Sequence, residues 1–243
     1  MSIEITGIGW VTSASMGCGK DHKHFTMPNE QLPEMTDRAV FDDPYLYFRR
    51  MDEYSRLGLT AIAFALKDAG LDEWTEKRNT GIIASTVYGC LGTDIDYYDT
   101  VMPQKELSTS PALFSYTLPN SFLGEAAIHF GLTGTSFIVN EQVPSGLVVL
   151  QMALNSIGCG ETETMLCGVC DLGCPPPFGG PPNVSPGALF FIIEKSPARE
   201  PLCYGKLRLN KKGSVIFNRA RINDLTMLVQ KCLASYHPFG VDM

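Results

Sequence analysis

The stretch Gly134-Thr-Ser-Phe-Ile-Val-Asn-Glu-Gln-Val-Pro-Ser-Gly-Leu147 decides the fold of this chain. Its first part, Thr135 to Val139, is rich in β-branched and aromatic residues and predicts a strand. A tight Pro-Ser-Gly turn follows, and Leu147 to Ile157 then has the apolar composition of a buried helix. A strand, a tight turn and a helix hold the side chains of the turn before the positive end of the helix dipole. An enzyme would place a nucleophile there, yet Gln142 and Val143 carry only an amide and a hydrocarbon.

The composition indicates a folded protein with a large core. Of the 243 residues, 44% are hydrophobic and 19% are charged, which excludes intrinsic disorder. No apolar run approaches the roughly 20 residues of a membrane span, and the N-terminus lacks the pattern of a secretion signal. We therefore expect a cytoplasmic protein. The net charge of −7 argues against a nucleic-acid partner, because nucleic acids select basic surfaces.

Lys and Arg residues nevertheless cluster at two places, Arg49-Arg50 and Lys206–Arg221. The ordinary interpretation of such clusters is a solvated face, and we favour it here. The functional interpretation is a docking surface for an acidic carrier protein.

The eight cysteines are dispersed and predict reduced thiols rather than a disulfide framework. Cys167-Gly-Val-Cys170 and Cys174 have a spacing typical of zinc ligands. This group lies at the end of the β-like run Glu163–Asp171, however, and no second Cys or His pair lies at a useful distance, so we expect no metal. A second possible metal site consists of Cys18, His22 and His24. It has even less support, because surface histidines are common.

The hydrophobic periodicity predicts alternating strands and helices, which is typical of a layered α/β fold. The predicted strands are Ser2–Val11, Thr80–Ser85, Thr135–Val139, Glu163–Asp171, Ala188–Glu194 and Tyr204–Leu209. The predicted helices are Asp52–Gly70, Asp94–Met102, Phe122–Phe130, Leu147–Ile157 and Ile222–Ser235. We expect Tyr204–Leu209 to pair with Ala188–Glu194. No linker divides the chain, so we expect one domain over residues 1–243.

Several segments, in consistent order, carry a resemblance to a known family. They are Ile5-Thr-Gly-Ile-Gly-Trp-Val-Thr12, Arg50-Met-Asp-Glu-Tyr-Ser-Arg-Leu57 leading to Ala65-Leu-Lys-Asp-Ala-Gly-Leu71, Leu113-Phe-Ser-Tyr-Thr-Leu-Pro-Asn120, Ile128-His-Phe-Gly-Leu-Thr-Gly134, Met165-Leu-Cys-Gly-Val-Cys-Asp171 and Ala188–Glu194. Together they resemble the N-terminal part of the β-ketoacyl synthases, the condensing enzymes of the thiolase fold. The resemblance implies a thiolase-like layered α/β/α architecture, with the N-terminal half essentially complete and the C-terminal half truncated. It implies neither a cofactor nor a metal.

The turn before the helix departs from the pattern of the active family. Those enzymes carry their cysteine in a Cys-x-Ser-Gly turn, and counting back from Ser145-Gly146 places Val143 there. A hydrocarbon cannot form a thioester. The dipeptide Glu141-Gln142 resembles the Glu-Gln of chain-length factors, the inactive partners in type II polyketide synthases, with a register shifted by one. Either Gln142 or Val143 thus takes the vestigial nucleophile position, and His237 matches neither histidine motif of the family.

The resemblance also implies roles in assembly and in an acyl tunnel. Condensing synthases pair the strand before the nucleophile across a dimer interface, which implies that Thr135, Phe137 and Val139 form a dimer strand. Tyr88 falls where the family has its pocket gatekeeper. A second group would line the tunnel or contact the partner, although such residues are most often ordinary core residues: Leu113, Phe114, Tyr116 and Leu118.

The favoured hypothesis is a non-catalytic, chain-length-factor-like subunit. It would bind a full-length ketosynthase as a heterodimer and set chain length on acyl carrier protein in type II fatty acid or polyketide synthesis, in an aryl-polyene pathway. One alternative is an enzyme in its own right, either a malonyl-carrier decarboxylase that uses Gln142 or a condensing enzyme with a displaced cysteine, Cys167 or Cys170. Another alternative is a homodimeric module that holds acyl carrier protein without processing it.

Overall fold

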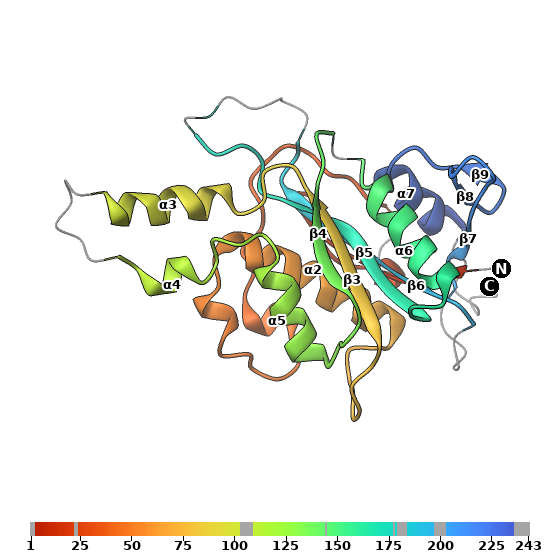
Figure 1. The fold of residues 1–243 in the computed structure, drawn as a ribbon, viewed down its shortest axis with the longest axis horizontal. Helices are drawn as coiled ribbons and strands as arrows, with labels where there is room; N and C mark the ends of the chain where they lie inside the picture. Colours follow the sequence, from red (N-terminus) through yellow and green to blue (C-terminus); the bar gives the residue numbers. More distant parts are fainter. Residues whose placement is uncertain are drawn as a thin grey trace, which may run out of the picture.

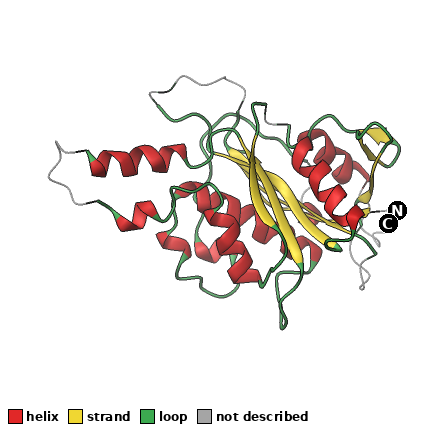
Figure 2. Ribbon diagram, viewed as in Figure 1, coloured by secondary structure: helices red, strands yellow, loops and turns green. Residues whose placement is uncertain are grey.

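The protein is a mixed β-sheet between two layers of helices (Figures 1 and 2). The computed structural model describes residues 3–21, 24–102, 109–143, 145–176, 178, 184–196 and 203–235. Within these residues no helix combines the length and the apolar composition needed to cross a membrane.

The described residues form nine strands in one sheet. The strands are β1 Ile3–Thr12, β2 Met16–Cys18, β3 Thr80–Thr86, β4 Ser136–Asn140, β5 Thr164–Asp171, β6 Gly187–Glu194, β7 Gly205–Leu209, β8 Val215–Phe217 and β9 Ala220–Arg221. The order across the sheet is β4-β3-β5-β6-β1-β7-β8-β9, and β2 pairs with β1. β3 is parallel to β4 and β5, whereas the remaining pairs are antiparallel.

The helices cover both faces of this sheet. They are η1 Gly19–Asp21, α1 Asp37–Val40, η2 Phe48–Arg50, α2 Glu53–Ala69, α3 Leu91–Val101, α4 Pro111–Phe114, α5 Ser121–Phe130, α6 Leu147–Cys159 and α7 Leu225–Ser235. One apolar core lies around α2 and α5, and a second lies around α6 and α7 on the opposite face. β3 and β6 are buried along their whole length, as expected for strands covered on both sides.

Helix α2 has the limits that its sequence predicts. The Asp52 carboxylate accepts a hydrogen bond from the backbone N–H of Ser55 at 3.0 Å, which caps the first turn. Gly70 ends the helix in the left-handed conformation, with φ at 65°. The helix lies very close to β1, because a Cβ atom added at Gly9 would overlap the backbone of Ala61 and Ala65.

The buried carboxylate of Asp68 fastens three segments to α2. It accepts hydrogen bonds from the backbone N–H of Ile8 at 2.8 Å, the backbone N–H of Lys20 at 3.0 Å and the hydroxyl of Tyr204 at 2.7 Å. Burial raises the pKa of Asp68, and these donors oppose the shift. Sequence analysis did not identify this residue.

The predicted helices and strands are confirmed to within a few residues, but one pairing is wrong. β7 pairs with β1 and β8, not with β6, because β5 and β1 already occupy both edges of β6. The short elements β2, η1, α1, η2, α4, β8 and β9 were not predicted. The Pro- and Gly-rich segment after β5 has no regular structure in the residues that are described.

Candidate functional site

The strand-turn-helix unit forms as predicted, with β4 ending at Asn140 and α6 beginning at Leu147. The backbone N–H of Glu141 donates to the carbonyl of Thr86 at 2.9 Å, which anchors the turn to β3. The hydroxyl of Ser145 donates to the Glu141 carboxylate at 3.2 Å. Pro144 lies outside the described residues. The turn is thus held on both sides of Gln142 and Val143.

Gln142 and Val143 are both exposed on this turn, and Val143 is 70% exposed. Neither side chain fills a cavity of its own chain. An amide and a hydrocarbon can contact a neighbouring molecule, but neither forms a covalent acyl intermediate. The assignment of one of them to a vestigial nucleophile position stays a prediction.

The two cysteines considered as displaced nucleophiles are fully buried in β5. Burial raises the pKa of Cys167 to about 12 and also raises that of Cys170. A nucleophilic cysteine needs access and a thiolate, and these side chains have neither. In the part of the chain that is described, no three His, Cys, Asp or Glu side chains are grouped to hold a metal ion. His22, from the second proposed ligand set, lies outside that part.

Thiol labelling should reflect this burial. At pH 8 in native buffer we expect Cys159, which is exposed, to react within minutes, whereas Cys167 and Cys170 react only after unfolding in urea. Raising the pH to 9 should not make Cys167 and Cys170 reactive, because burial keeps the pKa of both thiols above 9. Mass spectrometry of trypsin fragments reads out each site. Rapid native labelling of Cys167 or Cys170 would restore the displaced-nucleophile hypothesis.

The loop that carries Tyr88 is fixed by a buried carboxylate at the end of β5. Asp171 is 4% exposed and accepts hydrogen bonds from the Thr86 hydroxyl at 2.8 Å and from the backbone N–H groups of Val87 and Tyr88, both at 2.9 Å. Burial raises the pKa of Asp171, and the N–H donors oppose that shift. An acidic residue that ends an apolar strand was the sequence signal for this role, and sequence analysis missed it.

Replacing Asp171 with Asn should destabilise the protein by about 2 kcal/mol. Every neighbour of the carboxylate is a donor, so the amide nitrogen of Asn would face a donor without an acceptor. Urea unfolding measures the loss. Asp96→Asn, on the exposed surface of α3, is the matched control and should change stability by less than about 0.5 kcal/mol. Equal stability of the two variants would contradict the anchoring role assigned to Asp171.

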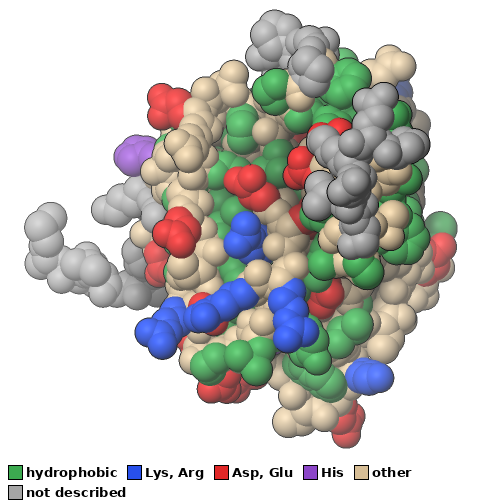
Figure 3. Space-filling model, turned by 90° about the vertical axis from the view of Figure 1, so that its left-hand side faces the viewer, with side chains coloured by type: hydrophobic (Ala, Val, Ile, Leu, Met, Phe, Trp, Pro, Cys, Tyr) green, Lys and Arg blue, Asp and Glu red, His purple; other side chains and the backbone are tan. Residues whose placement is uncertain are grey.

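Helices α3 and α4 form an arm that projects from the sheet (Figure 1). Several large apolar side chains on this arm and the turn after it are strongly exposed: Tyr98 at 59%, Val101 at 48%, Phe114 at 61% and Leu118 at 63%. Figure 3 looks onto this end of the molecule, where hydrophobic side chains lie beside Lys and Arg. Exposed apolar groups on one projection are typical of a protein-protein contact.

The proposed tunnel residues divide between two places. Leu113, in α4, and Tyr116, in the turn after it, are half-buried, and Tyr116 packs against the core around α2. Phe114 and Leu118 are exposed on the arm. Tyr88 lies apart from them in the sequence, on the loop between β3 and α3, and is half-buried.

Strand β4 is the edge of the sheet, with β3 as its neighbour on one side. Thr135 lies one residue before the strand, while Phe137 and Val139 pack against the core around α6. The carbonyl of Thr135 accepts from Ile82, and the N–H of Glu141 donates to Thr86. Because these groups alternate along a strand, the backbone groups of Ser136, Ile138 and Asn140 point to the free edge. In the described residues this edge is open to another strand.

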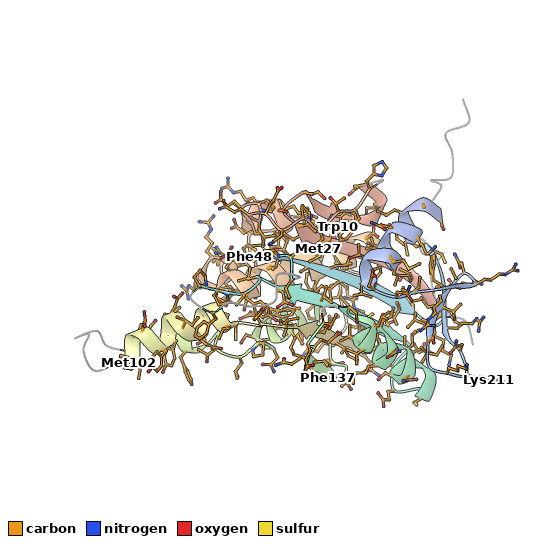
Figure 4. All side chains as sticks on the ribbon, turned by 90° about the horizontal axis from the view of Figure 1, so that it is seen from above. Trp10, Met27, Phe48, Met102, Phe137 and Lys211 are labelled. Carbon is orange, nitrogen blue, oxygen red and sulfur yellow. The ribbon has the colours of Figure 1, made fainter. Side chains whose placement is uncertain are left out.

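A cavity of about 140 Å³ lies at the head of α6. Ser145 and Asp171 line it, together with residues that sequence analysis did not consider, among them Met27 and Leu225. Figure 4 labels Met27 and Phe137 and shows them on different parts of the molecule. None of the proposed tunnel residues lines this cavity.

Residues 19–179 match the family model described as Beta-ketoacyl synthase, N-terminal domain. The chain belongs to the β-ketoacyl synthase family. The match covers both β4 and α6, so the turn that carries Gln142 and Val143 lies within the part of the chain that matches the family.

Solved structures with a similar fold include the ishigamide ketosynthase/chain length factor, with a TM-score of 0.65 and 18% identity over 87% of this chain and 68% of that chain. A second is the ketosynthase ApeO in complex with its chain length factor ApeC, from Xenorhabdus doucetiae. Its TM-score is 0.59, with 18% identity over 82% of this chain and 81% of that chain. A third is the AntDE:AntF complex of a type II polyketide synthase acyl-carrier protein with its ketosynthase. Its TM-score is 0.64, with 19% identity over 85% of this chain and 67% of that chain. These similarities confirm the predicted thiolase-like α/β fold of this family member.

Proposed function

We propose that this protein is a non-catalytic, chain-length-factor-like subunit of a ketosynthase heterodimer. The observation that carries the proposal is the turn before α6. It has the family's strand-turn-helix geometry but presents Gln142 and Val143 to the exterior. Cys167 and Cys170, the alternative thiols in β5, are fully buried and inaccessible. A subunit with this turn can contact a growing chain but cannot carry it as a thioester.

Two surfaces support assembly with a ketosynthase. The open edge of β4 offers backbone donors and acceptors at Ser136, Ile138 and Asn140 to a strand of the partner. The arm offers Phe114 and Leu118, whose exposure costs free energy unless another protein covers them. Both surfaces lie within residues 19–179, the part of the chain that matches the family model.

In such a heterodimer the arm would line the acyl tunnel, and its side chains would set the length of the chain growing on acyl carrier protein. Phe114 and Leu118 project from this subunit and are placed to contact the partner, whereas Tyr88 would close this subunit's own vestigial pocket. We assign the subunit to type II elongation, of the aryl-polyene kind, as a single-domain cytoplasmic protein. Leu113 and Tyr116, which are half-buried, would line the same tunnel or contact the partner.

Co-expression with a full-length ketosynthase tests the assembly. We expect the two chains to purify together as a heterodimer of one copy each, by native mass spectrometry, and the ketosynthase to gain yield and condensing activity. Recovery of this chain as a stable monomer that ignores every ketosynthase offered would refute the proposal. Recovery as a homodimer that binds acyl carrier protein would favour the holding module instead.

Decarboxylation of a malonyl carrier is the second candidate, because the exposed Gln142 amide lies before the N-terminus of the 13-residue helix α6. Under the proposed function we expect the isolated chain to release no carbon dioxide above background from malonyl-acyl carrier protein. Release that falls at least about tenfold in Gln142→Ala would overturn that expectation. Gln151→Ala, further along α6, serves as the control for folding and handling.

A further inference from the structure

The proposed function leaves unexplained a concentration of positive charge on β7, β8 and β9. Residues 203–223 contain six of the 19 Lys and Arg residues and none of the 26 Asp and Glu residues. Lys206 is paired with Glu4 at 3.5 Å. The other five are exposed, and we call them the basic hairpin face: Arg208, Lys211, Lys212, Arg219 and Arg221. In a chain with a net charge of −7, this is a strong local reversal of sign.

The sheet register places the strand arginines on one side. Arg208 of β7 and Arg221 of β9 both lie directly opposite Ile216 of β8. Ile216 is only 9% exposed, and the aliphatic stems of the two arginines can cover it. The alternate residues Leu207, Phe217 and Val215 point into the core around α6. The guanidinium groups therefore project from the solvent side of the hairpin.

Arg219 provides an independent reason to assign a function to this face. It lies in the two-residue turn between β8 and β9 with φ at 88°, and Asn218 before it has φ at 46°. Such turns favour glycine at the second position, because a side chain is strained in the left-handed region. Residues with such backbone strain cluster at functional sites, which supports a role for the Arg219 side chain.

We propose that the basic hairpin face binds the anionic surface of a lipid membrane, so that the protein associates with it peripherally. A specific protein interface would need an apolar or aromatic centre, and none of the exposed large hydrophobic side chains in the described residues lies on the hairpin. Anionic lipid head groups need only positive charge. The rest of this acidic chain repels such a surface weakly, because charges beyond about 10 Å are screened at physiological salt.

The position of the face permits simultaneous assembly with a partner. Figure 4 labels Lys211 and Met102 at opposite ends of the molecule, so the hairpin and the tip of α3 point away from each other. A ketosynthase bound at the arm and at β4 would leave the hairpin free. The inference does not depend on the proposed function, since it requires only this chain and a charged surface.

Vesicle flotation with the full-length chain tests the inference. We expect binding to vesicles of phosphatidylcholine and phosphatidylglycerol in equal amounts, no binding to phosphatidylcholine alone, and loss of binding as salt rises from about 0.05 to about 0.5 M. Each Lys or Arg near an anionic surface strengthens binding about fivefold, so Arg208→Gln with Arg221→Gln should weaken it at least about tenfold. Arg38→Gln with Lys77→Gln removes equal charge from exposed sites elsewhere and should bind like the wild type.

Two further variants separate charge from folding. Lys211→Gln with Lys212→Gln changes an exposed turn and should also weaken binding severalfold. Arg219→Gly should raise the melting temperature by roughly 2–4 °C while it weakens vesicle binding, a divergence that a structural role would not produce. Absence of binding to the anionic vesicles, or equal loss in the Arg38/Lys77 control, would overturn the proposal. So would tighter binding to an acidic carrier protein or to duplex DNA than to the vesicles.

Discussion

Ser136→Pro is expected to abolish assembly with a ketosynthase while leaving the subunit folded. The N–H of Ser136 points to the free edge of β4, since the neighbouring residues of the strand bond to β3. Proline removes this donor and places its ring where the partner strand would lie. One unsatisfied carbonyl on the partner costs about 2–3 kcal/mol, which corresponds to roughly 30- to 150-fold weaker binding before any clash.

Size-exclusion chromatography of the co-expressed chains, with titration calorimetry, measures this loss. Ser136 is exposed, so the substitution removes little packing. Ser136→Thr keeps the donor and should assemble normally. Phe137→Pro, whose N–H faces β3, should instead unfold the subunit. A Ser136→Pro subunit that binds ketosynthase with unchanged affinity would place the interface elsewhere than β4.

Gly9→Ala should destabilise the subunit by at least about 3 kcal/mol. The new Cβ would overlap the backbone of Ala61 and Ala65 in α2, and backbone atoms cannot move aside as a flexible side chain can. β1 lies in the interior of the sheet, between β6 and β7, so separating it from α2 disturbs the first core directly. We expect a lower urea midpoint with an unchanged slope.

The same substitution at Gly92 is the matched control. Gly92 lies in α3, and an added Cβ meets no atom within 4 Å. Alanine also favours a helix more than glycine does, so Gly92→Ala should raise stability by up to about 1 kcal/mol. Equal midpoints for Gly9→Ala and the wild type would show that β1 and α2 separate without cost. Such a result would also show that the close contact between Gly9 and α2 does not determine this fold.

Much of the fold could be predicted because its signals are local. The apolar period of α2, its cap at Asp52 and its end at Gly70 all lie within one segment of chain. The same holds for β3, whose wholly apolar composition indicates burial on both faces, and for α6. These patterns depend on the conformation of neighbouring residues and on burial of one face, so they can be recognised without knowing the partners.

The sequence by itself determined that the turn before α6 carries Gln142 and Val143 instead of a cysteine, since the identity of a side chain does not depend on folding. Only the tertiary structure decided that β7 pairs with β1, that β4 is the edge strand among the described residues and that Asp171 holds the Tyr88 loop. These features join residues far apart in the chain. Long-range pairing follows from the packing of the whole core, and local propensity carries no information about it.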